Sequence, residues 1–288
     1  MIKLLRPMRT LQAFLPIAAL LFAAVPRCAA AQSPEEIVST VVSNEIKFEA
    51  ADHSRWMYRD AYKSPEKDTV KLIIQTPQGN LSEIIEDHGQ PPSPQEHQAD
   101  LAHMQQLVVD PALRERQRRA EAHDGQQADD LMRMLPNAFL WQITGRDHGM
   151  IILASHPNPK FSPPSMSARV LASMSGSLFV DEHTMRLVKL TGRLMQPINF
   201  GWGLLGHLDA GGTFEIVRTE IAPGEWQITQ SHIHISGHAL FFKTIGDQED
   251  EVTSDYRPVP DGVDLDKAAE MIRSGQLARD LDAETHFQ

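Results

Sequence analysis

Two histidines in the sequence, His232 and His234, have a spacing that suits metal chemistry. In a β-strand, residues two apart point to the same face, so this pair could place two imidazoles on one metal ion. His207, Asp209 or Glu225 could add a ligand if the fold brought one of them close. The alternative is a pair of half-exposed polar residues opposite inward-facing isoleucines. A metal-dependent hydrolase built on these two histidines is one alternative function.

Other catalytic signatures are absent from the sequence. It contains no Gly-x-Ser-x-Gly, no phosphate-binding loop ending in Lys-Ser/Thr, no His-Glu-x-x-His and no dinucleotide-binding fingerprint after a strand. Asp181-Glu182-His183 has the composition of acid–base machinery, but it lies between two strand-like segments, where polar residues form hairpin turns. We therefore expect no catalytic residues, no metal and no cofactor, in a protein that is not an enzyme.

The composition excludes several classes of protein. The 288 residues include a single cysteine, Cys28, which excludes a disulfide-stapled scaffold, a cysteine-based zinc module and an iron–sulfur protein. The chain has 27 basic and 38 acidic side chains and a net charge of −11, whereas a nucleic-acid-binding protein needs a basic surface. We expect no nucleic-acid partner.

Residues 1–31 have the pattern of a Sec-type signal peptide. Basic residues precede an apolar run from Leu11 to Val25, and three alanines favour cleavage after Ala31. The run is shorter than the roughly 20 apolar residues of a membrane-spanning helix, so the cleaved protein is not expected to be integral to a membrane. Cleavage leaves 23 basic and 38 acidic side chains, a net charge of −15, and no cysteine. The predicted location is the periplasm or the exterior of the cell.

The rest of the chain combines a few helices with many short strands. Ser33 and Pro34 begin a helix over residues 34–51, and a closing helix covers residues 264–274. Because no helix separates each pair of strands, the pattern predicts an antiparallel meander. The strands are expected at 56–63, 69–76, 81–87, 139–145, 149–155, 170–180, 185–195, 213–222, 226–236 and 240–245. We expect one domain over residues 32–276, followed by a polar tail over 277–288.

A polar helical insertion over residues 89–135 separates the first three strands from the others. Its basic cluster is interpreted as a solvated helix face, because glutamates lie among the arginines. Contact with an anionic lipid or an acidic partner is the alternative. The arginines are Arg114, Arg116, Arg118 and Arg119.

Two strand-like segments are apolar enough to suggest a cavity. Along residues 170–180 every second side chain is apolar or small, which is typical of a buried face. Residues 149–155 are apolar on both faces, so both are covered or one lines a cavity. Phe200–Gly206, with alternating glycines, is interpreted as tight packing, or alternatively as the aromatic wall of a pocket. The candidate cavity residues are Met150, Ile152, Val170, Ala172, Met174, Leu178 and Trp202.

One hairpin pattern is similar to that of a known family. Residues 174–181 read Met-Ser-Gly-Ser-Leu-Phe-Val-Asp, and residues 185–190 read Met-Arg-Leu-Val-Lys-Leu. With the preceding hairpin at 139–159, this resembles the LolA/LolB-like superfamily of envelope proteins, which includes the amino-terminal domain of RseB/MucB-type regulators. The chain differs from that family in the 89–135 insertion and in its Gly-Trp-Gly segment. The resemblance implies an antiparallel half-barrel wrapped over helices, with an apolar cavity for acyl chains.

The predicted fold class is therefore α+β, an antiparallel β-meander that forms a half-barrel over helices. The predicted function is that of an exported, non-enzymatic periplasmic protein that binds a lipid or an acylated lipoprotein in an apolar cavity. Each buried methylene contributes roughly 0.8 kcal/mol, so a long acyl chain can bind without a specific polar site. The alternatives are an envelope sensor or protein-interaction module, and the metal-dependent hydrolase described above.

Overall fold

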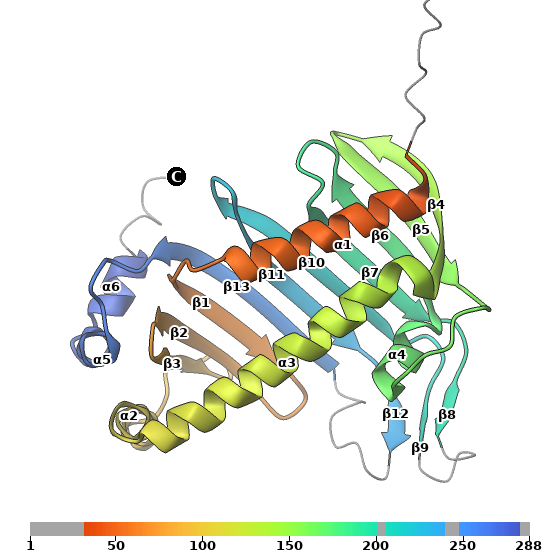
Figure 1. Ribbon diagram of the computed structural model, residues 1–288. Coiled ribbons are helices and arrows are strands. Elements are labelled where there is room, and N and C mark those ends of the chain that lie inside the picture. Colours follow the sequence, from red (N-terminus) through yellow and green to blue (C-terminus); the bar gives the residue numbers. More distant parts are fainter. Residues whose placement is uncertain (1–31, 201–205, 240–247, 283–288) are drawn as a thin grey trace, which may run out of the picture. The chain divides into compact units, whose positions relative to one another are not determined.

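The computed structural model of the chain describes residues 32–200, 206–239 and 248–282. Ten of their strands form one antiparallel sheet in the order β3-β2-β1-β13-β11-β10-β7-β6-β5-β4 (Figure 1). The sheet is open, because β3 and β4 pair on one side only. It curves around α1 and α3 without closing into a barrel, which confirms the predicted α+β meander.

The order of strands shows two meanders joined by a late strand. β13 lies between β1 and β11, so it links the first three strands to the others. The ten strands are β1 (Trp56–Lys63), β2 (Asp68–Thr76), β3 (Gly79–Asp87), β4 (Phe139–Asp147), β5 (Met150–Pro157), β6 (Met174–Asp181), β7 (Leu187–Leu194), β10 (Thr213–Ala222), β11 (Glu225–His234) and β13 (Gln248–Pro258). A separate three-stranded sheet contains β8 (Ile198–Phe200), β9 (Gly206–Leu208) and β12 (Gly237–Ala239).

The helices begin where serine or aspartate side chains cap their first turns. Ser33 and Ser93 each form a capping box with the glutamate three residues later, and a proline follows each serine. The predicted insertion is confirmed as two helices, which meet at the capping residue Asp110. The helices of the described residues are α1 (Pro34–Ala51), α2 (Pro94–Val109), α3 (Pro111–Ala138), α4 (Met166–Leu171), α5 (Leu265–Arg273) and α6 (Gln276–Asp282).

The expected strand over residues 170–180 is wrong in its first half. Ser165 caps α4, which ends at Leu171, and β6 begins only at Met174. Val170 and Ala172 are therefore not on a strand. Alternating apolar residues mimicked a strand there, whereas in the fold the short helix buries Ala168.

Two further expectations near the C-terminus are corrected. β13 was not predicted, because its acidic sequence is half-exposed and lacks a period-two apolar pattern. The expected polar tail contains α6, whose Leu277 and Leu281 are buried at helical spacing. The predicted signal peptide at 1–31 and the predicted strand at 240–245 lie outside the described residues.

The sheet packs helices on both of its faces, at opposite ends. One face can be followed along an unbroken row of cross-strand partners, whose side chains all point to the same side of the sheet. The row consists of Leu153, Leu178, Leu190, Ile216, Ser231, Glu251, Tyr62 and Thr69. We call the face that carries this row the inner face. At its β5–β6 end, Leu153 and Leu178 pack with residues of α1 and α3.

The opposite, outer face carries the second core, at the other end of the sheet. Leu72 and Ile74 of β2 point away from the row that contains Thr69. Both are buried with residues of α2, α5 and α6, including Met104, Ile272 and Leu277. These two hydrophobic clusters therefore lie on opposite faces. A third, smaller cluster, which includes Met174, Leu194 and Ile235, packs against Phe214 and Ile233.

Candidate functional site

The middle of the sheet has no fully buried residue on either face. Every described position of β10, β11 and β13 is half-buried or exposed, although these strands lie at the centre of ten. On the inner face, this region and the adjacent part of β7 carry apolar side chains that are only half-buried, namely Leu190, Phe214, Ile216 and Ile233. Central strands normally bury such side chains under a helix or second sheet.

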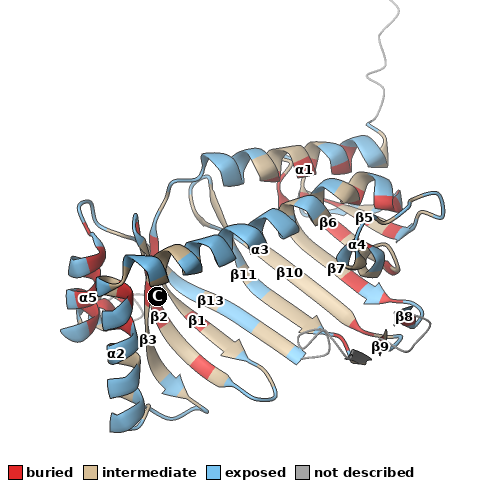
Figure 2. Cartoon of the chain, turned by 60° about the horizontal axis from the view of Figure 1, so that its bottom comes forward, coloured by how far each residue is buried: buried red, intermediate tan, exposed pale blue. Residues whose placement is uncertain are grey.

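The helix that crosses this region, α3, does not pack on it. Residues 118–128 are all exposed, which amounts to about three helical turns with no packed side (Figure 2). Only the ends of α3 are anchored. At one end Arg114 Nη1 donates to the carbonyl oxygens of Leu107 and Val108 in α2, at 2.6 and 2.7 Å. At the other, Trp141 Nε1 donates to the carbonyl oxygen of Leu135, at 3.0 Å.

The sheet beneath α3 and the side of α3 that faces it are thus both accessible to solvent. A helix that is polar on all sides is typical of a segment that bridges across solvent. We call the half-buried inner face of β7, β10, β11 and β13, which the exposed middle of α3 crosses, the inner groove. Its apolar floor is formed by Leu190, Phe214, Ile216 and Ile233.

The inner face changes from apolar to polar along its own row. Leu190 and Ile216 are followed by Ser231, Glu251 and Tyr62 on successive strands. The inner groove therefore has an apolar end over β7 and β10 and a polar end over β13 and β1.

An aromatic pair and a carboxyl pair mark this polar end. The rings of Tyr58 and Tyr256 stack with their centroids 4.9 Å apart. Burial raises the pKa of Asp60, and burial together with the negative charge of the neighbouring Asp60 raises the pKa of Glu251. Asp60 is 8% exposed, and its Oδ1 is buried without a hydrogen-bond partner among the described residues. Burial also raises the pKa values of both tyrosines.

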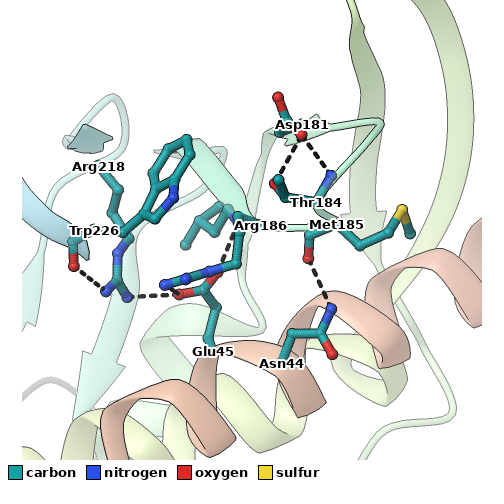
Figure 3. Close-up of polar contacts among 9 residues, drawn as sticks. Asn44, Glu45, Asp181, Thr184, Met185, Arg186, Arg218 and Trp226 are labelled. Carbon is teal, nitrogen blue, oxygen red and sulfur yellow. Dashed lines mark hydrogen bonds and ion pairs between the residues drawn. The ribbon is translucent and has the colours of Figure 1, made fainter. Parts of the chain in front are cut away.

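A buried ionic cluster fixes α1 across the sheet beside the groove (Figure 3). Glu45 is 2% exposed, and its Oε1 accepts hydrogen bonds from Arg186 Nε and from the backbone N–H of Leu187, both at 2.8 Å. Its Oε2 accepts a hydrogen bond from Arg186 Nη2 at 3.2 Å and forms an ion pair with Arg218 Nη1 at 2.8 Å. One carboxylate thus joins α1 to the start of β7 and to β10.

Aromatic and backbone contacts complete this cluster. The guanidinium of Arg186 lies 3.8 Å from the ring centroid of Phe48 and 5.6 Å from that of Trp226. Arg218 Nη2 donates to the carbonyl oxygen of Trp226 at 3.1 Å. Sequence reasoning missed the cluster, although a signal was present. Glu45 continues the apolar stripe of α1, four residues after Val41, where a charged residue indicates a buried partner.

The structure brings only some of the predicted cavity residues together, Met174 with Val170 and Leu178 with Ala172. Met174 and Leu178 are buried in packed clusters on the inner face. Met150 and Ile152 alternate with the buried Ile151 and Leu153, so they point to the outer face. Val170 and Ala172 lie in and directly after α4, half-buried against the clusters. Trp202 lies outside the described residues.

The histidine pair does lie on one face, as its spacing predicts. His232 Nδ1 and His234 Nε2 both lie within hydrogen-bond distance of Asp250 Oδ1, at 2.6 and 2.9 Å. Over the part of the chain that the structure describes, no group of three or more histidine, cysteine or acidic residues could hold a metal ion.

Two other polar segments have structural roles. Asp181 Oδ1 accepts hydrogen bonds from the backbone of His183 and from the backbone and hydroxyl of Thr184. The bonds from Thr184 lower the pKa of Asp181, and the segment is the turn between β6 and β7, as predicted. In α3, Arg118 and Arg119 both pair with Glu115, as expected of a solvated helix face.

Comparison with known proteins gives only distant structural similarity. No family model and no curated protein matches the chain. Among solved structures, it is similar to a DUF1329 family protein from Desulfovibrio piger, with 11% sequence identity and a TM-score of 0.25. The match covers 81% of this chain and 95% of that chain. A TM-score this low carries no argument about function.

No helix among the described residues is long and apolar enough to span a membrane.

Proposed function

We propose that this protein is a non-enzymatic envelope protein that binds the acyl chain of a lipid or of an acylated lipoprotein in the inner groove. The observation that carries the proposal is the unpacked middle of the sheet. Four apolar side chains of the groove floor are only half-buried, and residues 118–128 of the helix that crosses the sheet are exposed. A bound acyl chain would complete this core, at roughly 0.8 kcal/mol for each methylene removed from water.

The sequence supports the same function. The signal-peptide pattern of residues 1–31 and the acidic remainder fit an exported protein. The β6–β7 hairpin, on which the resemblance to LolA/LolB-like proteins rests, forms as the motif predicts, with Asp181 at its turn. The groove floor differs from the residues first expected, since it lies on β7, β10 and β11.

A pair of adjacent residues offers a matched test. Ile216 points into the groove, whereas Val217, the next residue of β10, points to the outer face. With the mature chain from Gln32, a fluorescent fatty-acid probe should bind saturably. Ile216→Asp should weaken that binding at least about tenfold, because it places a charge against the acyl chain.

The control, Val217→Asp, should leave probe binding within a factor of about two of the unchanged protein, because Val217 lies on the opposite face of β10. Circular dichroism should show that both variants remain folded. If the unchanged protein does not bind the probe, or if both variants bind equally well, the proposal is wrong. A protein-interaction module would instead retain its partner in a pull-down with the Ile216→Asp variant.

A further inference from the structure

The outer face of the central strands carries two adjacent rows of polar side chains. The first row of cross-strand partners is Ser175, Arg193, Thr213, His234 and Gln248. The second is Ser177, Thr191, Glu215, His232 and Asp250. Both rows cross five strands without an apolar side chain, directly behind the apolar floor of the inner groove.

These rows line a hollow in the surface. A cavity of about 470 Å³ opens there, and its walls come from β6, β7, β10 and β11. The polar side chains around it are Ser175, Thr191, Arg193, Thr213, Glu215 and His232. Gly176 and Gly192 also line it, which leaves backbone rather than side chains at that part of the wall.

Arg193 is the charged group of this cavity that has no partner among the described residues. Lys189 Nζ lies 2.7 Å from Glu215 Oε1, so that carboxylate is neutralised. Asp250 accepts from the two histidines, although burial opposes its ionised form, and its pKa lies below the usual value. Within the described ranges, no hydrogen bond or ion pair involves the guanidinium of Arg193. It is exposed between two hydroxyl residues, Ser175 and Thr213.

We infer that this outer cavity binds the phosphate group of a phosphorylated ligand. A guanidinium binds a phosphate through two parallel N–H donors, and neighbouring hydroxyl groups donate to the remaining oxygens. Ser175, Thr191 and Thr213 supply those hydroxyls, and His232 supplies an imidazole at the cavity wall. A carboxylate has too few oxygens to use this many donors. The volume exceeds that of a phosphate ion and leaves room for an organic group.

The site is separate from the proposed acyl-chain groove, because it lies on the opposite face of the same strands. Its ligand could be a soluble phosphorylated compound or a phospholipid headgroup, since both present the same phosphate. The test therefore uses inorganic phosphate in one arm. The other arm uses vesicles of phosphatidylcholine with and without phosphatidic acid.

Amide NMR of the mature chain measures the first arm. Inorganic phosphate should shift the amides around Arg193 saturably, with a Kd of about 1 mM or tighter. Arg193→Gln should weaken phosphate binding at least about tenfold. The affinity of Arg193→Lys should lie between those of the unchanged protein and the Gln variant, because lysine keeps the charge but lacks the two-donor fork. The matched control is Arg169→Gln, which changes another exposed arginine, on α4, and should have no effect.

The two arms distinguish the sources of phosphate. Binding to free phosphate that depends on Arg193 supports the inference with a soluble ligand. Arg193-dependent binding to vesicles only when they contain phosphatidic acid supports it with a lipid headgroup. If neither is bound, or if Arg193→Gln binds as tightly as the unchanged protein, the inference is wrong. Ile216→Asp should leave phosphate binding unchanged, so failure of the acyl-chain proposal is detected separately.

Discussion

Arg186 Nε donates to Glu45 Oε1 over 2.8 Å, and both side chains are almost completely buried, at 3% and 1% exposure. The pair lies between α1 and the sheet, 141 residues apart in sequence. Because Glu45 also pairs with Arg218, one carboxylate holds α1 in place over β7 and β10. The position of α1, and hence one boundary of the inner groove, depends on this contact.

Glu45→Gln should destabilise the protein strongly. Removing one partner of a buried ion pair leaves uncompensated charge, which typically costs about 3–5 kcal/mol in the free energy of unfolding. Urea denaturation measures the change. Glu49→Gln, an exposed position one turn later in α1, should change stability by less than about 0.5 kcal/mol. Equal effects of the two substitutions would contradict the role assigned to Glu45.

Gly125→Ala should stabilise α3. Gly125 lies within the exposed middle of the helix, and an added Cβ would meet no atom within 4 Å. Alanine is favoured over glycine in a helix interior by roughly 0.5–1 kcal/mol. Hydrogen exchange of the amides of residues 118–128 should slow by a corresponding factor. Faster exchange in the variant would show that this segment packs on something that the added methyl group disturbs.

Gly192→Ala should destabilise the sheet. An added Cβ at this position would lie 2.1 Å from a ring atom of Phe214, the cross-strand partner on β10, so the ring must move. Overpacking of this kind typically costs about 1–3 kcal/mol, measurable by thermal or urea unfolding. Gly145→Ala is the control, because its nearest contact would be at 3.9 Å. A destabilisation as large in the control would refute the packing argument.

The Asp60–Glu251 pair should make stability fall as the pH rises. Burial raises the pKa of both carboxyl groups above their ordinary values of 3.8 and 4.5, so the folded protein keeps a proton that the unfolded chain releases. This contribution is fully present below the ordinary pKa values and is lost as the pH rises through the raised ones.

Asp60→Asn removes this coupled titration. Urea unfolding from about pH 4 to neutral should therefore show a smaller decline in the free energy of unfolding than in the unchanged protein. Asp250→Asn is the control, because the contribution of Asp250 to stability changes with pH in the opposite direction. The pKa of Asp250 is lowered, so its contribution is lost as the pH falls. Parallel pH profiles for Asp60→Asn and the unchanged protein would contradict the raised pKa of Asp60.

Local signals in the sequence predicted most elements of the fold. The Ser33-Pro34 start of α1 and the alternating strands of the first meander follow from capping and from side-chain periodicity. The strand β13 could not be predicted from such signals, because it is acidic and half-exposed and has no apolar alternation. It is stabilised by pairing with its two neighbouring strands. The segment around Val170 shows the opposite failure, in which alternation occurs without a strand.

The groove itself could not be predicted from single segments. β5 is apolar on both faces, and the sequence does not say that Ile151 rather than Ile152 faces the helices. The groove floor depends on how β7, β10 and β11 align, which is set by pairing between distant residues. Burial of Glu45, by contrast, was detectable from its position on the apolar stripe of α1.

Mass spectrometry of the mature protein, purified from cell envelopes without detergent, tests the central claim most directly. An acyl-chain-binding protein should carry a lipid or lipid-modified peptide, detected as an adduct under native conditions and released on denaturation. The adduct should be present on the unchanged protein and on Val217→Asp, and absent from Ile216→Asp. An unchanged protein that carries no acyl-containing ligand, and gains none when incubated with envelope lipids, would contradict the account.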